Sequence, residues 1–238
     1  MSNNNLLNQL KSSENNFVSH EIFDVFEEIT ITEFKTKDFI FKGKVVFHNK
    51  VFFNNVNVNF NSVEFKEGVI IDMLSNISID YCNANMIEII NSDIELEIFE
   101  GKIGFLSCNN TKLNKLRLHN VDLTKFQSKD SIFSELSFLG SKKVKNNIQT
   151  FCIDRGKIIS LNLSHLEIGI KVNYSASVIR ESSCFVSSAT IDNLTIDDSN
   201  FNHKSEFNGN INQINFIENV HFDNLNLNGE ISHVDFKN

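Results

Sequence analysis

Histidines and carboxylates are the residues of this sequence whose types could support acid–base or metal chemistry. The seven histidines lie at positions 20, 48, 119, 165, 203, 221 and 233. None of them forms the HxH or HExxH spacing that brings two imidazoles to one metal ion. Glu95, Glu97 and Glu100 alternate with apolar residues, which is typical of the outward face of a strand rather than of an acid–base pair. We therefore predict no catalytic residue, no metal and no cofactor, and we expect a protein that is not an enzyme.

An apolar residue recurs at every fifth position between Ile98 and Val178. Fourteen of the seventeen positions in this series are apolar, which is far more than the apolar content of 41% predicts by chance. A period of five matches neither the helical period of about 3.6 residues nor the strand period of about two. We infer a coil that turns a corner every five residues and points one apolar side chain inward from each side.

A second inward position lies two residues before each of these, because residues i and i+2 share one face of an extended segment. The doublet Leu96/Ile98 recurs as Leu116/Leu118 after four of the five-residue steps, so we predict four sides per coil. The sequence contains no proline, and no position therefore interrupts a ladder of backbone hydrogen bonds. An all-β parallel β-helix of about ten coils follows from these patterns.

Several five-residue segments resemble the unit of the pentapeptide-repeat family, in which Asp or Asn precedes a central Leu or Phe. The matches are VNFNS (58–62), VDLTK (121–125), LNLSH (161–165), SNFNH (199–203), LNLNG (225–229) and VDFKN (234–238). The resemblance runs from Phe26 to Asn238 and implies a right-handed quadrilateral β-helix. Larger residues than the family's Ala or Ser at position i−2 favour a looser or partly three-sided coil. The competing fold is a leucine-rich repeat, which LSNISIDYCNA and LNKLRLHNVDL fit locally, although apolar doublets also occupy its variable half.

The N-terminal region differs from the rest of the sequence. Residues 1–16 are rich in Asn, and we expect them to be disordered. Val18, Ile22, Val25 and Phe26 have the spacing of one helical face, which predicts a short capping helix within 1–28. The solenoid is then expected over 29–238, with an irregular segment near 179–190.

Charge and cysteine content narrow the possible partners and compartment. The net charge is −8, and it divides into −9 for residues 1–100, +7 for 101–190 and −6 for 191–238. Such a profile argues against direct binding of nucleic acid, since no basic patch stands against a neutral background.

The cysteines indicate the compartment. No CxxC pair occurs among Cys82, Cys108, Cys152 and Cys184, which is typical of reduced thiols. We expect a cytoplasmic, bacterial protein from an AT-rich genome, with no membrane segment; secretion as an effector stays open.

The outward positions predict an interaction surface. If every coil consists of four such sides, Leu139, Ile159 and Ile179 form an outward apolar ladder, with Ile132, Cys152 and Val172 beside it. A contiguous exposed apolar patch marks an interface. One-residue bulges that turn these side chains inward are the alternative.

The final coil predicts a second contact. The five-residue apolar repeat continues to the last coil, which contains Ile231, Val234 and Phe236, and no capping element follows it in the sequence. We therefore predict a homodimer through this coil, as the family resemblance also implies.

Two functions follow. The first is a non-enzymatic binding or scaffold protein with a protein partner of unknown identity. The alternative, implied by the family, is an acidic DNA mimic that protects or inhibits a topoisomerase such as DNA gyrase. Lys115, Arg117 and Lys142 interrupt the acidic charge, so a continuous acidic face sheltered from them would favour mimicry.

Overall fold

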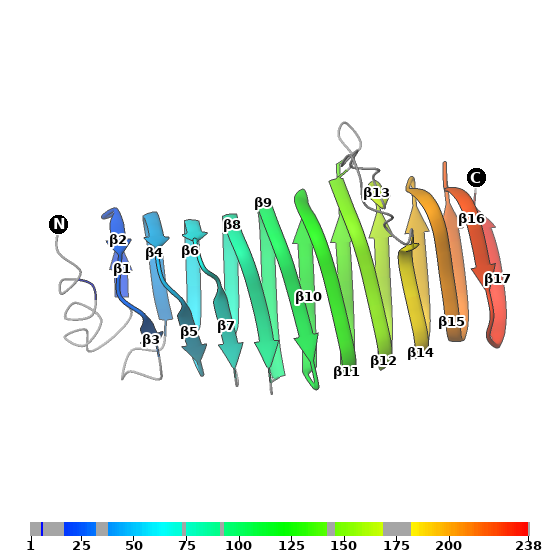
Figure 1. Ribbon diagram of the computed structural model, residues 1–238, viewed down its shortest axis with the longest axis horizontal. Helices are drawn as coiled ribbons and strands as arrows, with labels where there is room; N and C mark the ends of the chain where they lie inside the picture. The colour runs from blue at the N-terminus through cyan, green and yellow to red at the C-terminus, as the bar shows by residue number, and fades with distance from the viewer. Residues whose placement is uncertain are drawn as a thin grey trace, which may run out of the picture.

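The computed structural model is a rod of stacked parallel strands, with the N-terminus at one end and the C-terminus at the other (Figure 1). It describes residues 6, 17–31, 38–72, 75–90, 93–141, 146–168 and 182–237, with the side chains of 93, 167, 182–189, 202–204 and 208 left out. The strands are β1 (Phe17–Ser19), β2 (Phe23–Val25), β3 (Ile29–Ile31), β4 (Asp38–Phe47), β5 (Val51–Asn54), β6 (Asn57–Phe65), β7 (Val69–Asp72), β8 (Asn76–Ile90), β9 (Asp93–Asn109), β10 (Lys112–His119), β11 (Val121–Leu139), β12 (Asn146–Ser164), β13 (Leu166–Ile168), β14 (Ser182–Asp197), β15 (Asn200–Ile217), β16 (His221–Leu227) and β17 (Ile231–Lys237).

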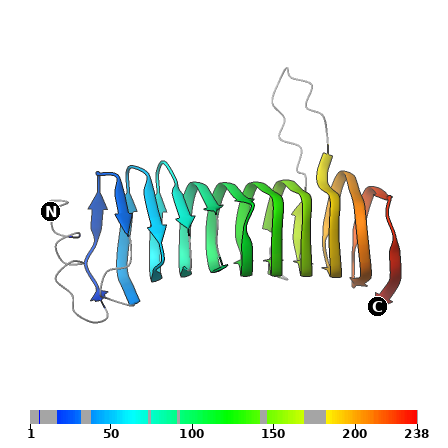
Figure 2. The same ribbon diagram turned by 90° about the horizontal axis from the view of Figure 1, so that it is seen from below.

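Register along one side of the rod confirms the predicted solenoid. The stacked residues on this side are Phe17, Phe39, Val58, Ile77, Leu96, Leu116, Leu136, Leu161, Leu194, Ile214 and Val234. All of these pairs are parallel, and each step adds about 4.8 Å to the length of the rod. The turn-by-turn rise of the chain is clear from the side (Figure 2).

Four sides are visible in the middle of the rod. In one coil, residues 115–118 form side 1, 121–123 form side 2, 125–128 form side 3 and 131–133 form side 4, and the sides of the other coils stack on these.

The coil length varies along the rod. Stacked residues on successive coils are 19 residues apart at Asp38 and Asn57, 20 at Glu97 and Arg117, 25 at Ser137 and Asn162, and 33 at Ser164 and Asp197. In the shorter coils side 4 shrinks to one buried residue, such as Val56 or Ser75. These coils therefore approach the three-sided form.

The corners depend on left-handed backbone. Among the residues that the structure describes, eight other than glycine have φ between 37° and 55°: Asn55, Asn110, Asn120, Asp130, Arg155, His165, Asp198 and Glu218. Asn and Asp adopt this conformation more readily than other residues with a side chain. Asn110, Asp130 and Arg155 follow one another along one corner, and His165, Asp198 and Glu218 along a second, so these two corners form lines along the rod.

The residues of the five-residue apolar repeat form the core of the rod. Ile98, Ile103 and Cys108 are at most 1% exposed, as are Phe133, Ile148 and most of the series. Stacking one coil above another also places aromatic rings face to face. The rings of Phe41 and Phe60 are 4.9 Å apart and nearly parallel, and those of Phe47 and Phe65 are 5.5 Å apart. These spacings are close to the strand spacing of about 4.8 Å, so the aromatic contacts follow from the register.

The predicted N-terminal helix is wrong. Residues 17–31 form β1, β2 and β3, which pair with the next coil. The buried residues alternate, with Phe17, Phe23 and Val25 inward, whereas Val18, Ile22 and Phe26 are 50%, 68% and 55% exposed. Hence the solenoid already includes Phe17, ahead of the predicted start at residue 29. The segment 182–190, predicted to be irregular, belongs to β14, although its pairing contains two register shifts; residues 179–181 lie outside the described residues.

Candidate functional site

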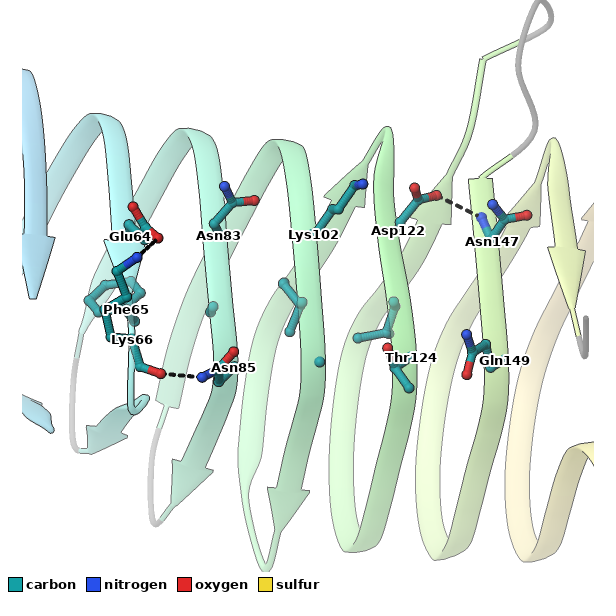
Figure 3. Close-up of a pocket in the computed structure, with 14 residues that line it drawn as sticks. Glu64, Phe65, Lys66, Asn83, Asn85, Lys102, Asp122, Thr124, Asn147 and Gln149 are labelled. Carbon is teal, nitrogen blue, oxygen red and sulfur yellow. Dashed lines mark hydrogen bonds and ion pairs between the residues drawn. The ribbon is translucent and has the colours of Figure 1, made fainter. Parts of the chain in front are cut away.

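A polar groove runs along side 2 of the rod and the corner that leads to side 3 (Figure 3). Its first row contains one outward residue from each of five successive coils. These residues are Glu64, Asn83, Lys102, Asp122 and Asn147. The second row lies two residues further along each coil and comprises Lys66, Asn85, Gly104, Thr124 and Gln149. The groove has a volume of about 480 Å³, within the range of small-ligand sites.

Gly104 and Ala84 form the floor of the groove at its centre. A Cβ atom at Gly104 would lie 2.5 Å from the carbonyl oxygen of Asn85 in the coil below. The close approach of two backbones therefore requires glycine here. As a result, the second row has no side chain between Asn85 and Thr124.

Hydrogen bonds fix several groups at both ends of the groove. The backbone N–H of Asn147 donates to Oδ1 of Asp122 at 3.0 Å. The side-chain amide of Asn85 donates to the carbonyl oxygen of Lys66. Glu64 is paired with Lys66 and, at 3.3 Å, with Lys44. The hydrogen bond from Lys66 is the main reason that the pKa of Glu64 lies below its usual value, and Lys44 adds to it.

The two carboxylates of the groove are too far apart to act as a catalytic pair. Glu64 and Asp122 are separated by three coils, which corresponds to about 14 Å. A pair of carboxylates that hydrolyses a glycosidic bond is about 5–9.5 Å apart. Among the described residues, no group of three or more His, Cys, Asp or Glu side chains could hold a metal ion.

The predicted apolar ladder does not form. Leu139 pairs with His119 below and with Ser164 above, so Ile159 is not in its column. The reason is that the coil from β11 to β12 is 25 residues long, five residues longer than expected. Cys152 likewise pairs with Gln127 on side 3 rather than with Ile132. Ile179 and Val172 lie outside the described residues.

Two of the predicted residues nevertheless lie near one another at the surface. Ile132 on side 4 is 45% exposed, and Ile159 at the following corner is 44% exposed. They lie diagonally, one strand spacing of about 4.8 Å and two residues apart, because Ile132 pairs with Lys157. Lys112 pairs with Ile132 from the other side, and Lys129 lies at the preceding corner. We name this surface, formed by Lys112, Lys129, Ile132, Lys157 and Ile159, the lysine–isoleucine face.

The predicted dimer end carries exposed apolar side chains. Phe236 is 74% exposed and Val234 is 39% exposed, whereas Ile231 is partly buried against the core. Their counterparts one coil earlier, Phe216 and Ile214, point the same way. The last described coil thus offers the same inward positions as the coil before it.

An ion-pair cluster on side 1 bears on the DNA-mimic prediction. Glu97, Lys115, Arg117 and Glu135 lie on neighbouring coils. Lys115 contacts Glu97 at 2.9 Å, and Arg117 binds both Glu97 and Glu135. On this side the cations lie among the carboxylates instead of on a separate face, so the acidic charge is interrupted. Mimicry gains no support from this cluster, and it stays a prediction.

We expect Arg117→Met to weaken the fold at neutral pH by roughly 1.5–3 kcal/mol, the usual contribution of hydrogen bonds to charged groups. The hydrogen bonds from Arg117 hold the pKa of Glu135 below its ordinary value of 4.5, although burial opposes them. A carboxyl group whose pKa is lowered on folding stabilises the protein above its unfolded pKa, and this contribution is lost as the pH falls through the folded pKa. The unfolding free energy of the variant should therefore depend less on pH below 4.5 than that of the wild type.

Urea unfolding at a series of pH values measures this difference. Arg155→Met is the matched control, because the pair of Arg155 with Asp130 is more exposed, at 53% and 39% of the two side chains. Exposed pairs contribute little to stability, since water and salt screen their charges. Equal losses in the two variants would contradict the assigned role of Arg117.

The cysteines are free thiols where the structure describes their side chains. Cys82, Cys108 and Cys152 form no disulfide. Burial raises the pKa of Cys82 to about 12 and also raises that of Cys108. A buried neutral thiol is unreactive, so we assign Cys82 and Cys108 to the core.

The described part of the chain contains no helix with the length and apolar character needed to cross a membrane. No family model, curated protein or solved structure matches the sequence. The resemblance to pentapeptide-repeat proteins therefore stays a prediction, and function is argued from the surface of the rod.

Proposed function

We propose that the protein is a non-enzymatic binding and scaffold protein whose rod presents its outer surface to a protein partner. The observation that carries this proposal is the exposure of Ile132 and Ile159 at neighbouring outward positions. By contrast, the nearby isoleucines Ile148, Ile153 and Ile158 occupy buried inward positions. Exposed apolar side chains that adjoin one another are typical of an interface.

The charges of the lysine–isoleucine face indicate the chemistry of the partner. Lys112, Lys129 and Lys157 are exposed and surround Ile132. A complementary surface would be acidic at its rim and apolar at its centre, since complementary potentials steer association. Asp130 is held by Arg155 through two hydrogen bonds of 2.8 Å, so its charge is compensated at the corner.

We expect the double variant Ile132→Ser, Ile159→Ser to bind its protein partner about tenfold more weakly, because truncated anchor residues cost more than about 1 kcal/mol. The immobilised rod would be exposed to extract of the native host, and retained proteins would be identified by mass spectrometry. Phe99→Ser is the matched control, since Phe99 is 38% exposed but lies away from this face. If both variants retained the same amount of the partner protein, the lysine–isoleucine face would not be the binding surface.

We also propose that the last coil associates with a second copy of the chain. Apolar side chains such as Val234 and Phe236 would then be covered by the same residues of the partner copy, which is the self-complementary contact of a twofold dimer. Backbone groups at the open edge of a parallel stack would gain partners in the same step.

Phe236→Asp is expected to convert this dimer to a monomer, because a carboxylate would be buried against its symmetry mate without a counter-charge. Sedimentation equilibrium over a range of concentrations measures the change. Ile22→Asp is the control, because Ile22 is 68% exposed at the opposite end of the rod. A wild-type protein that stays monomeric at every concentration would refute the proposal.

We propose that the protein is located in the cytoplasm, which the free thiols of Cys82 and Cys108 support.

The alternative function is that of a DNA mimic. Inhibition of a gyrase supercoiling reaction by the purified protein would support this alternative.

A further inference from the structure

We infer that the groove on side 2 is a binding site for a linear, uncharged, hydroxyl-rich chain, an oligosaccharide, which lies along the axis of the rod. The inference does not depend on the protein-binding function, because the groove lies on side 2 and the lysine–isoleucine face on side 4. It depends on the shape, the charge, the free polar groups and the spacing of the groove.

The shape of the groove fits an extended ligand. Its rows span five coils from Glu64 to Asn147, or about 19 Å at the spacing of stacked strands. Ala84 and Gly104 line the groove with small residues, and Asn83, Lys102 and Asp122 follow one another along it on successive coils (Figure 3). A chain that follows the groove crosses the strands and contacts each coil once.

The charge of the groove argues against a charged ligand. Glu64 and Asp122 balance Lys66 and Lys102, so the lining is neutral. Nucleic acids need a groove in which cations follow the phosphates. A strongly acidic or basic chain would meet a repelling group within one or two coils. The favoured ligand is therefore polar and uncharged.

Several polar side chains of the groove remain available to a ligand. Lys102, Thr124 and Gln149 are exposed and have no hydrogen bond or ion pair among the described residues. The side-chain amide of Asn147 is also without a partner there, since Asn147 uses its backbone N–H to bind Asp122. Ammonium, hydroxyl and amide groups at successive coils supply both donors and acceptors. Sugar hydroxyls, which both donate and accept, match this mixture.

The spacing of the groups favours a sugar chain over a peptide. Polar side chains recur in the groove at each coil, about 4.8 Å apart, whereas an extended peptide presents side chains to one face about every 6.6 Å. A peptide would thus move out of step within two coils. A sugar unit carries hydroxyls at every ring and can contact each coil in turn.

Titration of the full-length protein with linear neutral hexasaccharides tests the inference. The probes are fragments of β-1,4-glucan, β-1,4-mannan, β-1,4-xylan and chitin, and the readout is the backbone amide chemical shifts. At least one probe is expected to shift the amides of the groove, including those of Gly104 and Thr124, in a saturable way. The double variant Lys102→Met, Gln149→Ala is expected to bind that probe about tenfold more weakly, which corresponds to the loss of about 1.4 kcal/mol.

Gln127→Ala, Lys129→Met is the matched control, because it removes the same chemical groups from positions outside the groove. The control variant is expected to bind like the wild type. If no probe shifts the groove amides, or if both variants bind equally well, the inference is wrong. Shifts of the groove by single-stranded DNA or by an acidic peptide, with none by the sugars, would also overturn it.

Discussion

Replacement of Phe138 by alanine is expected to lower the free energy of unfolding by about 3–5 kcal/mol, the usual cost of removing a buried aromatic side chain. Phe138 is 2% exposed, and its ring lies 5.0 Å from that of Phe126 and 5.3 Å from that of Phe151. The cluster joins successive coils, with Phe126 stacked on Phe151. Its loss would leave a cavity that neighbouring coils cannot fill, because their backbones are held by the ladders on every side.

Equilibrium unfolding in urea, followed by circular dichroism, measures this loss. Phe99→Ala is the matched control, since Phe99 is an outward residue that is 38% exposed and stacks on His119. The control is expected to change the unfolding free energy by less than about 1 kcal/mol. A cost of less than about 1 kcal/mol for Phe138→Ala would contradict the assigned packing.

Gly101→Ala is expected to be at least as damaging. A Cβ atom there would lie 1.8 Å from the carbonyl oxygen of Cys82 in the coil below, so the two coils would have to separate. In addition, the φ angle of Gly101 is 139°, which a residue with a side chain adopts at a cost of about 1–3 kcal/mol. Both effects act at the middle of the rod, and we expect little folded protein at physiological temperature.

Gly68→Ala separates the two effects. The φ angle of Gly68 is 141°, but the nearest atom to an added Cβ is 3.0 Å away, at Met86. Thermal unfolding of both variants should therefore show a moderate loss for Gly68→Ala and a much larger loss for Gly101→Ala. Similar melting temperatures for the two variants would show that crowding against Cys82 has been overestimated.

The solenoid can be predicted because an inward residue at every fifth position has a simple physical cause. Each side of the coil has room for about two inward side chains, and a corner follows. The prediction fails at the N-terminal segment for an equally physical reason. Val18, Ile22 and Val25 fit a helical face, but Phe17, Phe23 and Val25 also fit strands, and a pattern this short does not decide between them. The adjacent coil decides, since it offers partners at Phe39 and Val45.

The surface is harder to predict than the core. Whether a side chain points inward depends only on its place within its own coil. Which outward side chains lie above one another depends, in contrast, on the length of every coil between them. Thus the sequence places Leu139 and Ile159 in one column, although the coil above Leu139 has 25 residues and brings Ser164 over it. For the same reason, the sequence alone does not predict that the groove residues Lys102, Asp122 and Asn147 lie side by side. Their common signal, a polar residue directly before a buried one, is visible in the sequence once the coil lengths are known.

Unequal coils also give the rod a defence against misfolding. In a stack of identical coils, the chain can slip by one whole coil and still place every apolar side chain inward. Where coils of unequal length adjoin, a slip would lay a coil of 19 residues, with its shortened side 4, in the place of one of 20 residues, or a coil of 20 residues in the place of one of 25. Its corners would then fall over the sides of the next coil, and the left-handed residues would lose their alignment. The unequal lengths that hide the surface from prediction therefore disfavour a slip at each place where the coil length changes.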